Sequence, residues 1–341
     1  MKTKDFDTES LGQDSVDNLL NSISDIVFHE YDQKKTIIYS KNDIDPIPLS
    51  SFSEKDIKIL KTIFKVIKEK ERGNPEKSDF QIVFYDHYIR LSSLQSISGK
   101  IYNCRNMPKE FILLEDAGFP DYIIKELLHE RLNKGGLVFI SGAPGQGKSN
   151  TAAAFIDSRL KNFKGVFIAI EDPVEIPLHG THGKGQCIQV PVEDTFANCI
   201  KRSLRSYPAG QNCGLFIGEL RDYESAIAAV QGAIDGRLVV TTFHTKSLEL
   251  AFERLSNLLS QKLTKEESFN LIAESFKLGI HQRLVKTTNP NGKTDLRLRP
   301  QILVDSQEVY QFIRQEKISG ILDQIERQYT QYKNKNKITY R

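Results

Sequence analysis

One run of eight residues, Gly142–Ser149, constrains the fold of this chain more than any other segment. It reads Gly-Ala-Pro-Gly-Gln-Gly-Lys-Ser and follows directly after the apolar stretch Leu137–Ile140. Glycines at these positions let successive backbone N–H groups converge on phosphate oxygens, while the lysine neutralises phosphate charge and the serine hydroxyl completes the ligand shell of Mg²⁺. The run therefore predicts a buried strand, a phosphate-binding loop and a helix, in that order.

The residues that follow the loop support this prediction. Residues 150–156 read Asn-Thr-Ala-Ala-Ala-Phe-Ile and have the small side chains and the helical spacing that the third element requires. We expect the loop and the start of the helix to bind a nucleoside triphosphate, with Ser149 also at the Mg²⁺ ion. The predicted nucleotide-binding residues are Gly142, Ala143, Pro144, Gly145, Gln146, Gly147, Lys148, Ser149 and Asn150.

Composition limits the class of protein. A chain of 341 residues is long enough for two domains. Its 39% hydrophobic and 27% charged residues are ordinary values for globular proteins. The net charge of +3 argues against a dedicated nucleic-acid binder with a dominant basic field, although a local patch stays possible. No apolar run approaches the ~20 residues of a membrane span, and the N-terminus lacks an apolar signal core. These features predict a cytoplasmic protein with reduced, structural cysteines.

Changes in composition and in hydrophobic pattern divide the chain into four parts. Residues 1–24 are polar with little periodicity, which indicates a flexible N-terminal arm or a short docking helix. Residues 25–107 alternate strand patterns with one amphipathic helix from about Ser53 to Lys70, which predicts a small α+β domain. We expect a linker at 108–117 and a P-loop ATPase domain over 118–341, the last third of the chain being mostly helical.

Beyond the phosphate loop, apolar strands alternate with helical stretches. The strands are expected at 165–170, 213–217 and 237–242, and each is almost continuously apolar. Strands of this kind belong in a parallel sheet that helices cover on both faces. The second domain is therefore predicted to be α/β.

Polar residues follow each of these strands, at the edge of the sheet where ligands bind in such folds. Glu171 and Glu175 follow the first strand, where a carboxylate could orient an attacking water. Glu219 follows the second strand and is the natural residue for the Mg²⁺ shell, directly or through water. His244 follows the third strand, where an imidazole could sense the γ-phosphate. Taken singly, Glu171 could instead be a helix cap, Glu219 a surface ion pair and His244 a structural histidine.

With these motifs in this order, the chain resembles the secretion ATPases, the hexameric motors of type II and type IV secretion and of type IV pili. The resemblance covers about residues 80–340. Four segments resemble the Walker A loop, the acidic Asp box, the atypical Walker B motif and the His box of that family, and they are Gly142–Ser149, Ile170–Glu175, Gly218–Asp222 and Thr241–Thr245.

The resemblance implies a fold and a set of partners. It implies a RecA-like P-loop NTPase domain, a smaller α+β (PAS-like) N-terminal domain and a helical C-terminal segment. It further implies a homohexamer that uses ATP and Mg²⁺ and works with inner-membrane components of a secretion or pilus machine. Such a protein would be cytoplasmic, peripheral at the inner membrane through its partners, and without direct contact to nucleic acid.

The resemblance also implies roles for single residues. Glu175 would position or activate the water, and Glu219 would organise the metal. Arg90 and Arg105 stand where N-domain arginines of the family reach the γ-phosphate of the neighbouring subunit. The alternative for both is an ordinary solvated arginine on a strand.

Several departures bear on the branch of the family. Arg237 stands where pilus-retraction relatives typically carry a histidine, and a Gln-Arg-Glu stretch of those relatives is reduced to Gln189-Val190. No four-cysteine zinc module follows Val285, unlike in the type II secretion ATPases. These departures favour the DotB-like branch of type IVB secretion and conjugation.

Two functions from other classes remain open. Conjugation machinery also uses P-loop hexamers on DNA, so a DNA translocase or helicase is the main alternative, and DNA-stimulated turnover with a steep salt dependence would favour it. A small-molecule kinase could use the same loop, but the sequence shows no lid or acceptor motif for it.

Overall fold

The computed structural model describes residues 11–41, 45–73, 75–192, 194–208, 210–288, 294–334 and 338–341, without the side chains of residues 294 and 295. The chain divides into two compact units. One comprises the chain up to Glu110 together with Pro173–Pro177, and the other comprises Phe111–Asp172 and Leu178–Arg341. Within the described ranges, no helix combines the length and apolar character needed to cross a bilayer.

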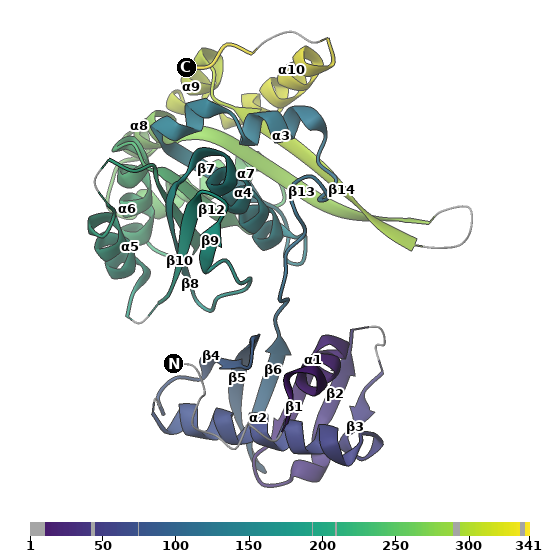
Figure 1. The fold of residues 1–341 in the computed structure, drawn as a ribbon. Coiled ribbons are helices and arrows are strands. Elements are labelled where there is room, and N and C mark those ends of the chain that lie inside the picture. Colours follow the sequence, from purple (N-terminus) through teal and green to yellow (C-terminus); the bar gives the residue numbers. More distant parts are fainter. Residues whose placement is uncertain are drawn as a thin grey trace. The chain divides into compact units, whose positions relative to one another are not determined.

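The first unit is an antiparallel sheet with two main helices (Figure 1). The strand order is β3-β2-β1-β6-β5-β4, and the predicted α+β class is confirmed. The strands are β1 (Ile23–His29), β2 (Ile37–Ser40), β3 (Ile47–Pro48), β4 (Asp79–Phe84), β5 (His87–Ser96) and β6 (Gly99–Asn106). The helices are α1 (Gln13–Ser22), α2 (Glu54–Arg72) and the short η2 (Gln33–Lys35) and η3 (Leu49–Ser51).

Helix α2 forms where its spacing predicts it. Ser53 is the N-cap, because its hydroxyl accepts a hydrogen bond from the Asp56 N–H at 3.2 Å. The apolar positions of α2 lie on one face and are buried, among them Ile59, Ile63 and Ile67. This face packs into the core of the first unit.

Helix α1 lies within residues 1–24, the segment for which a flexible arm or a short docking helix is predicted. Residues 13–22 form a helix, and Val16, Leu19 and Leu20 are buried in the same core as α2. Their helical spacing is present in the sequence, but it is too short to stand out from the polar residues around it. Residues 1–10 of the predicted arm lie outside the described residues.

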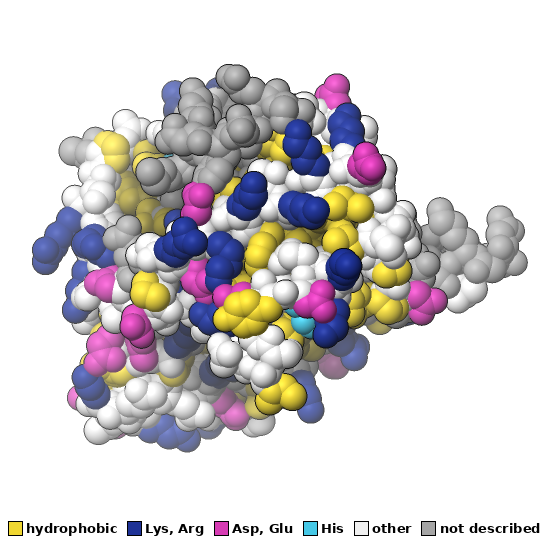
Figure 2. Space-filling view, turned by 90° about the horizontal axis from the view of Figure 1, so that it is seen from below, with side chains coloured by type: hydrophobic (Ala, Val, Ile, Leu, Met, Phe, Trp, Pro, Cys, Tyr) yellow, Lys and Arg dark blue, Asp and Glu magenta, His cyan; other side chains and the backbone are white. Residues whose placement is uncertain are grey.

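Helix α2 also presents a basic surface. Figure 2 shows Lys and Arg side chains gathered on the face of the molecule where α2 lies. The exposed lysines of this helix include Lys55, Lys58, Lys61 and Lys65. A local basic patch therefore exists despite the near-neutral charge of the whole chain.

The second unit is built on an eight-stranded sheet in the order β14-β13-β7-β12-β11-β8-β10-β9. Its inner strands are parallel, as predicted, and only the edge strands β9 and β14 pair antiparallel. The strands are β7 (Gly136–Ser141), β8 (Gly165–Glu171), β9 (Gly180–His182), β10 (Gly185–Pro191), β11 (Cys213–Glu219), β12 (Leu238–Phe243), β13 (Phe276–Thr288) and β14 (Thr294–Val304).

Helices cover the sheet. Helix α4 (Lys148–Phe163) packs against β7, β8 and β12, and its middle is fully buried. A separate apolar cluster joins Leu137 and Phe139 to five further helices and to the start of α10 (Ile321–Lys333). Those helices are α5 (Phe196–Arg205), α6 (Tyr223–Ile234), α7 (Leu248–Leu259), α8 (Lys265–Ser275) and α9 (Gln307–Arg314). The α/β class of this domain is confirmed.

The last third of the chain is less helical than predicted, because β13 and β14 form a long antiparallel hairpin. Strand β13 pairs with β7 only over Phe276–His281, so the hairpin continues past the edge of the sheet (Figure 1). The predicted C-terminal helical segment follows it. It consists of α9, η5 (Ile318–Gly320) and α10 (Ile321–Lys333).

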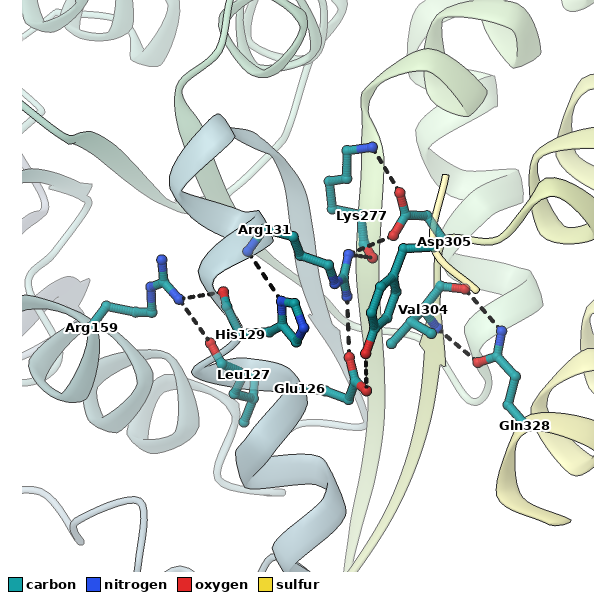
Figure 3. A network of polar contacts seen from close by, with 10 residues as sticks. Glu126, Leu127, His129, Arg131, Arg159, Lys277, Val304, Asp305 and Gln328 are labelled. Atoms are coloured by element: carbon teal, nitrogen blue, oxygen red, sulfur yellow. Dashed lines mark hydrogen bonds and ion pairs between the residues drawn. The ribbon is translucent and has the colours of Figure 1, made fainter. Parts of the chain in front are cut away.

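A buried ionic network fixes the base of this hairpin (Figure 3). The Asp305 carboxylate accepts hydrogen bonds from Arg131 at 2.5 Å and from Lys277 at 2.7 Å. Glu126 accepts a hydrogen bond from the Tyr340 hydroxyl at 2.8 Å. The network joins α3 (Asp121–Leu127) and η4 (Glu130–Lys134) to the ends of β13 and β14.

Candidate nucleotide-binding site

The phosphate loop joins β7, which ends at Ser141, to α4, which begins at Lys148. Gly145 and Gly147 have φ values of 74° and 77°, in the left-handed region that favours glycine. Gly147 is the N-cap of α4, and no side chain caps the helix. Gly147 supplies no side-chain acceptor to the first turn of α4, and an anion is a natural ligand at the positive end of a helix.

The loop has room for that anion. A Cβ atom built on Gly145 would meet no heavy atom within 4 Å, so space is open on this side of the loop. Lys148 is 5% exposed, and its ammonium group donates to the carbonyl oxygens of Gly142 and Ala143, each at 3.0 Å. Its nitrogen also lies 3.1 Å from Nδ1 of His244. The structure thus brings the predicted residues Lys148 and His244 together, and the loop fits a bound phosphate.

Strand β13 holds the loop from the side. The Gln146 carbonyl accepts a hydrogen bond from the Gln282 side chain at 2.6 Å, and the Gln146 side chain accepts one from the Leu284 N–H at 2.6 Å. A Cβ atom on Gly142 would lie 2.6 Å from the Gln282 carbonyl oxygen. Glycine at 142 is therefore needed for the close approach of β13, and Gln282 is a supporting residue that the sequence analysis did not single out.

The last residue of β7 is tied to β13 as well. The Ser141 hydroxyl lies 2.9 Å from Nδ1 of His281, and both side chains are buried. Burial, with a smaller effect from the Arg283 charge, lowers the pKa of His281. His281 is therefore neutral at physiological pH and acts as a hydrogen-bonding partner.

Glu171 lies at the end of β8 and is 4% exposed. The Gln189 amide donates to Oε1 of Glu171 at 3.0 Å. The side-chain oxygen Oε1 of Gln189 accepts in turn from the Leu178 and His179 N–H groups at 2.7 and 2.9 Å. Gln189 thus fixes the orientation of the Glu171 carboxylate, a function that the sequence analysis missed.

Glu219 is the last residue of β11. Nε of Arg221 donates a hydrogen bond to the Glu219 carboxylate at 2.5 Å. The same guanidinium lies 3.6 Å from the Asp172 carboxylate. The ion pair that we weighed as an alternative for Glu219 is thus present. Nowhere in the described ranges do three His, Cys, Asp or Glu side chains gather as metal ligands. Residues suited to a Mg²⁺ shell here are the Ser149 hydroxyl on α4 and Glu219.

Three predicted site residues lie in the first unit. Glu175 belongs to the segment Pro173–Pro177, and the neighbouring Val174 carbonyl accepts from the Gln81 side chain at 3.0 Å. Glu175 thus belongs to the first unit, and its role at the phosphate loop stays a prediction.

Arg90 on β5 and Arg105 on β6 are directly opposite each other. Both point away from the core, because their neighbours Ile89, Leu91 and Cys104 are buried. Arg105 donates to the Asp25 carboxylate at 2.9 Å. The first unit thus presents two guanidinium groups side by side on one face of its sheet.

Asn150, predicted to touch nucleotide, lies in the first turn of α4. Its side-chain amide is bonded to the backbone of Ile112. This contact joins the start of the second unit to the helix that follows the phosphate loop.

Comparison with known proteins identifies the family. The family model described as type II/IV secretion system protein matches residues 8–334. Type II secretion system protein E of Dickeya dadantii (strain 3937) is 30% identical over 221 residues, which are 64% of this chain and 41% of that protein. The type IV pilus ATPase PilU of Pseudomonas aeruginosa is 35% identical over 185 residues, which are 53% of this chain and 44% of that protein. The chain thus spans about two fifths of the length of these relatives.

Solved structures share the fold. The crystal structure of the pilus retraction motor PilT with bound ADP has a TM-score of 0.74 and 24% identity, covering 95% of this chain and 94% of PilT. The Legionella pneumophila ATPase DotB has a TM-score of 0.70 and 19% identity, covering 96% and 91%. The predicted RecA-like fold is confirmed. Because the family model spans most of the sequence, the chain belongs to the family of type II/IV secretion system proteins.

Proposed function

We propose that this chain hydrolyses ATP to ADP and phosphate and uses the energy to drive a type IV secretion or pilus machine. The observation that carries the proposal is the phosphate loop itself. Helix α4 begins there without a side-chain cap, Lys148 is buried, and the space beside Gly145 is open. An ATP phosphate at this position would accept from the first N–H groups of α4 and from Lys148.

The surrounding residues then have distinct roles. Ser149, and Glu219 through water, would hold Mg²⁺, which when bound neutralises charge on the phosphates. Glu171 is pre-oriented by Gln189 at the end of the neighbouring strand and is suited to order the water. Glu175 is proposed to position or activate the attacking water, and His244 to respond to the γ-phosphate through its contact with Lys148.

We further propose that catalysis is shared between subunits of a homohexamer. The paired guanidinium groups of Arg90 and Arg105 are suited to stabilise charge on the γ-phosphate of a neighbouring subunit. Binding of ATP would close the interface between subunits, and hydrolysis would reopen it by rotating the domains as rigid bodies. DotB is among the proteins of the same fold, which supports a motor of the type IVB branch. We place the hexamer in the cytoplasm, bound to inner-membrane components of the machine.

A second candidate function is DNA translocation in a conjugation apparatus. The exposed lysines of α2 favour it, because a local basic surface can bind a phosphate backbone (Figure 2).

The deciding experiment measures ATPase activity over a protein dilution series, with light scattering on the same samples and with and without DNA. Lys148→Ala is expected to lower turnover at least ~100-fold, whereas Lys161→Ala, an exposed lysine on the same helix, leaves it unchanged. Activity that rises with assembly and ignores DNA supports the secretion motor. Normal turnover in Lys148→Ala would defeat the site assignment, and strong stimulation by DNA would favour the translocase.

A further inference from the structure

The second unit contains a cavity that the phosphate loop does not use. Its volume is about 630 Å³, within the range of small-molecule sites. It is lined by α3, α10 and the hairpin β13–β14, and none of its lining residues belongs to Gly142–Asn150. The cavity lies at the edge strand β14, which β13 separates from the strand that carries the phosphate loop.

One wall of the cavity is aromatic. Tyr122 of α3 is stacked on Tyr332 of α10, with ring centroids 4.5 Å apart and an interplanar angle of 28°. Tyr329 lies 6.2 Å from Tyr122 between ring centroids. The Lys333 ammonium lies 4.6 Å from the centroid of the Tyr329 ring. Rings arranged in this way offer faces on which a planar ligand can stack.

Another part of the lining carries two arginines whose arrangement is unfavourable by itself. Arg283 of β13 and Arg299 of β14 are directly opposite each other on the paired strands, and both side chains are exposed. Among the residues that the structure describes, neither arginine forms an ion pair. Like charges directly opposite each other destabilise a strand pair. Lys333 and one carboxylate, that of Glu326, also line the cavity, so its described lining has an excess of positive charge.

We propose that this cavity binds a second nucleotide, distinct from the substrate at the phosphate loop. A ligand with both a planar ring and an anionic group can stack on the tyrosines and neutralise the charge of the two arginines. Two guanidinium groups side by side match the geometry of a phosphate, and a nucleobase can stack on an aromatic side chain. A nucleoside monophosphate or diphosphate has both parts.

The hairpin connects this cavity to the phosphate loop. Arg283 lies between Gln282 and Leu284, the two residues that bond Gln146 of the loop. His281 lines the cavity and is bonded to Ser141, the residue before the loop. A ligand that orders this part of β13 also orders the supports of the loop, so it raises the affinity for ATP, and ATP raises its affinity in return. This effect on ATP rests on the proposed function, whereas binding in the cavity does not.

The test starts from Lys148→Ala protein, in which the phosphate loop is disabled. Isothermal titration with GMP and with ADP is expected to show one saturable site per chain. Adding Arg283→Gln and Arg299→Gln is expected to weaken that binding at least tenfold. Arg297→Gln is the matched control, since it removes an exposed arginine of β14 that does not line the cavity.

The outcomes separate the two proposals. Absence of nucleotide binding in Lys148→Ala, or equal binding with and without the two cavity arginines, would overturn the second site. Inorganic phosphate binding as tightly as GMP would also overturn it, because the tyrosine wall would then contribute nothing. In the protein with Lys148 in place, saturating GMP is expected to lower the Kd for ATP at least threefold. An unchanged Kd for ATP would overturn the coupling. ATP binding that ignores Lys148→Ala would refute the proposed function and leave the cavity measurement valid.

Discussion

Asn150 holds Ile112 by both backbone groups. The Asn150 Oδ1 atom accepts from the Ile112 N–H at 2.8 Å, and its Nδ2 donates to the Ile112 carbonyl at 3.2 Å. The Ile112 side chain itself is 57% exposed, so this amide clamp is what fixes the position of the residue. Asn150→Ala is expected to raise the hydrogen exchange rate of the Ile112 amide at least tenfold, because two hydrogen bonds are lost.

Asn150→Asp separates the two bonds. An aspartate keeps the acceptor for the Ile112 N–H and loses the donor to its carbonyl, so exchange of the Ile112 amide should stay close to that of the wild type. Asn162→Ala, which removes an asparagine near the other end of α4, is the control. Unchanged exchange in Asn150→Ala would show that the clamp does not persist in solution.

Gln146 is predicted to set the affinity for ATP. Gln146→Ala removes the bond from Leu284 and leaves the backbone bond from Gln282, so the loop keeps its path but loses part of its support. We expect KM for ATP to rise about threefold to tenfold while kcat changes less than twofold, which steady-state kinetics can measure. A fall in kcat with unchanged KM would contradict a purely supporting role.

Mixing of variants tests catalysis between subunits. Lys148→Ala and Arg90→Ala are each expected to be inactive alone. If Arg90 acts on a neighbouring subunit, mixed assemblies contain interfaces with an intact lysine on one side and an intact arginine on the other. Remixing from dissociated subunits should then restore a measurable fraction of the wild-type ATPase rate. Mixtures as inactive as their components would place Arg90 outside the reaction.

The Asp305 network is predicted to be a main source of stability for the second unit. Asp305→Asn leaves Arg131 and Lys277 with a neutral partner in a place where Asp305 and Arg131 are nearly buried. We expect the free energy of unfolding to fall by about 3 kcal/mol, measured by urea denaturation. Asp323→Asn, an exposed aspartate on α10, should change it by less than about 0.5 kcal/mol.

Glu71 is predicted to make the first unit sensitive to acid. Burial would raise the pKa of Glu71, but hydrogen bonds from Lys100, Lys68 and Tyr102 outweigh it and lower the pKa to about 2. A carboxyl with a depressed pKa stabilises the fold above its ordinary pKa of about 4.5, and this contribution is lost as the pH falls towards 2.

The matching measurement compares urea denaturation of wild type and Glu71→Gln between pH 3 and pH 7. The difference in unfolding free energy should be about 2 kcal/mol at pH 7 and should shrink as the pH falls below 4.5. Glu69→Gln, an exposed residue of the same helix, is the control. A difference independent of pH would show that packing, and not charge, is what the substitution changes.

The sequence predicted the elements whose signals are local. Gly142–Ser149 identifies its own strand, loop and helix, and Ser53 marks the start of α2. In the larger sheet, strands β7, β8, β11 and β12 follow from runs of apolar and β-branched residues. The order of polar residues after β8, β11 and β12 also placed Glu171, Glu219 and His244 at the edge of the sheet.

What the sequence did not predict depends on contacts between distant segments. Gln189 acts through Glu171, 18 residues away, and Gln282 acts through Gln146, 136 residues away. A glutamine has no local pattern that reveals such a partner. The sequence analysis missed the hairpin β13–β14. Strand β13 pairs with β7 only as far as His281 and continues beyond the sheet, so its two halves have different surroundings and no single hydrophobic period describes the strand. Domain boundaries and the roles of Glu175, Arg90 and Arg105 stay predictions.

The uncapped start of α4 has a consequence for the protein at rest. Helix α4 has a fully buried middle and begins at Lys148 without a side-chain cap, so its positive end favours a bound anion. Any anion that fills this position stabilises the fold by mass action, by about 2.7 kcal/mol at a hundred times its Kd. The melting temperature of the larger unit would then report how much nucleotide surrounds the protein, and survival at high temperature would depend on energy supply as well as on sequence.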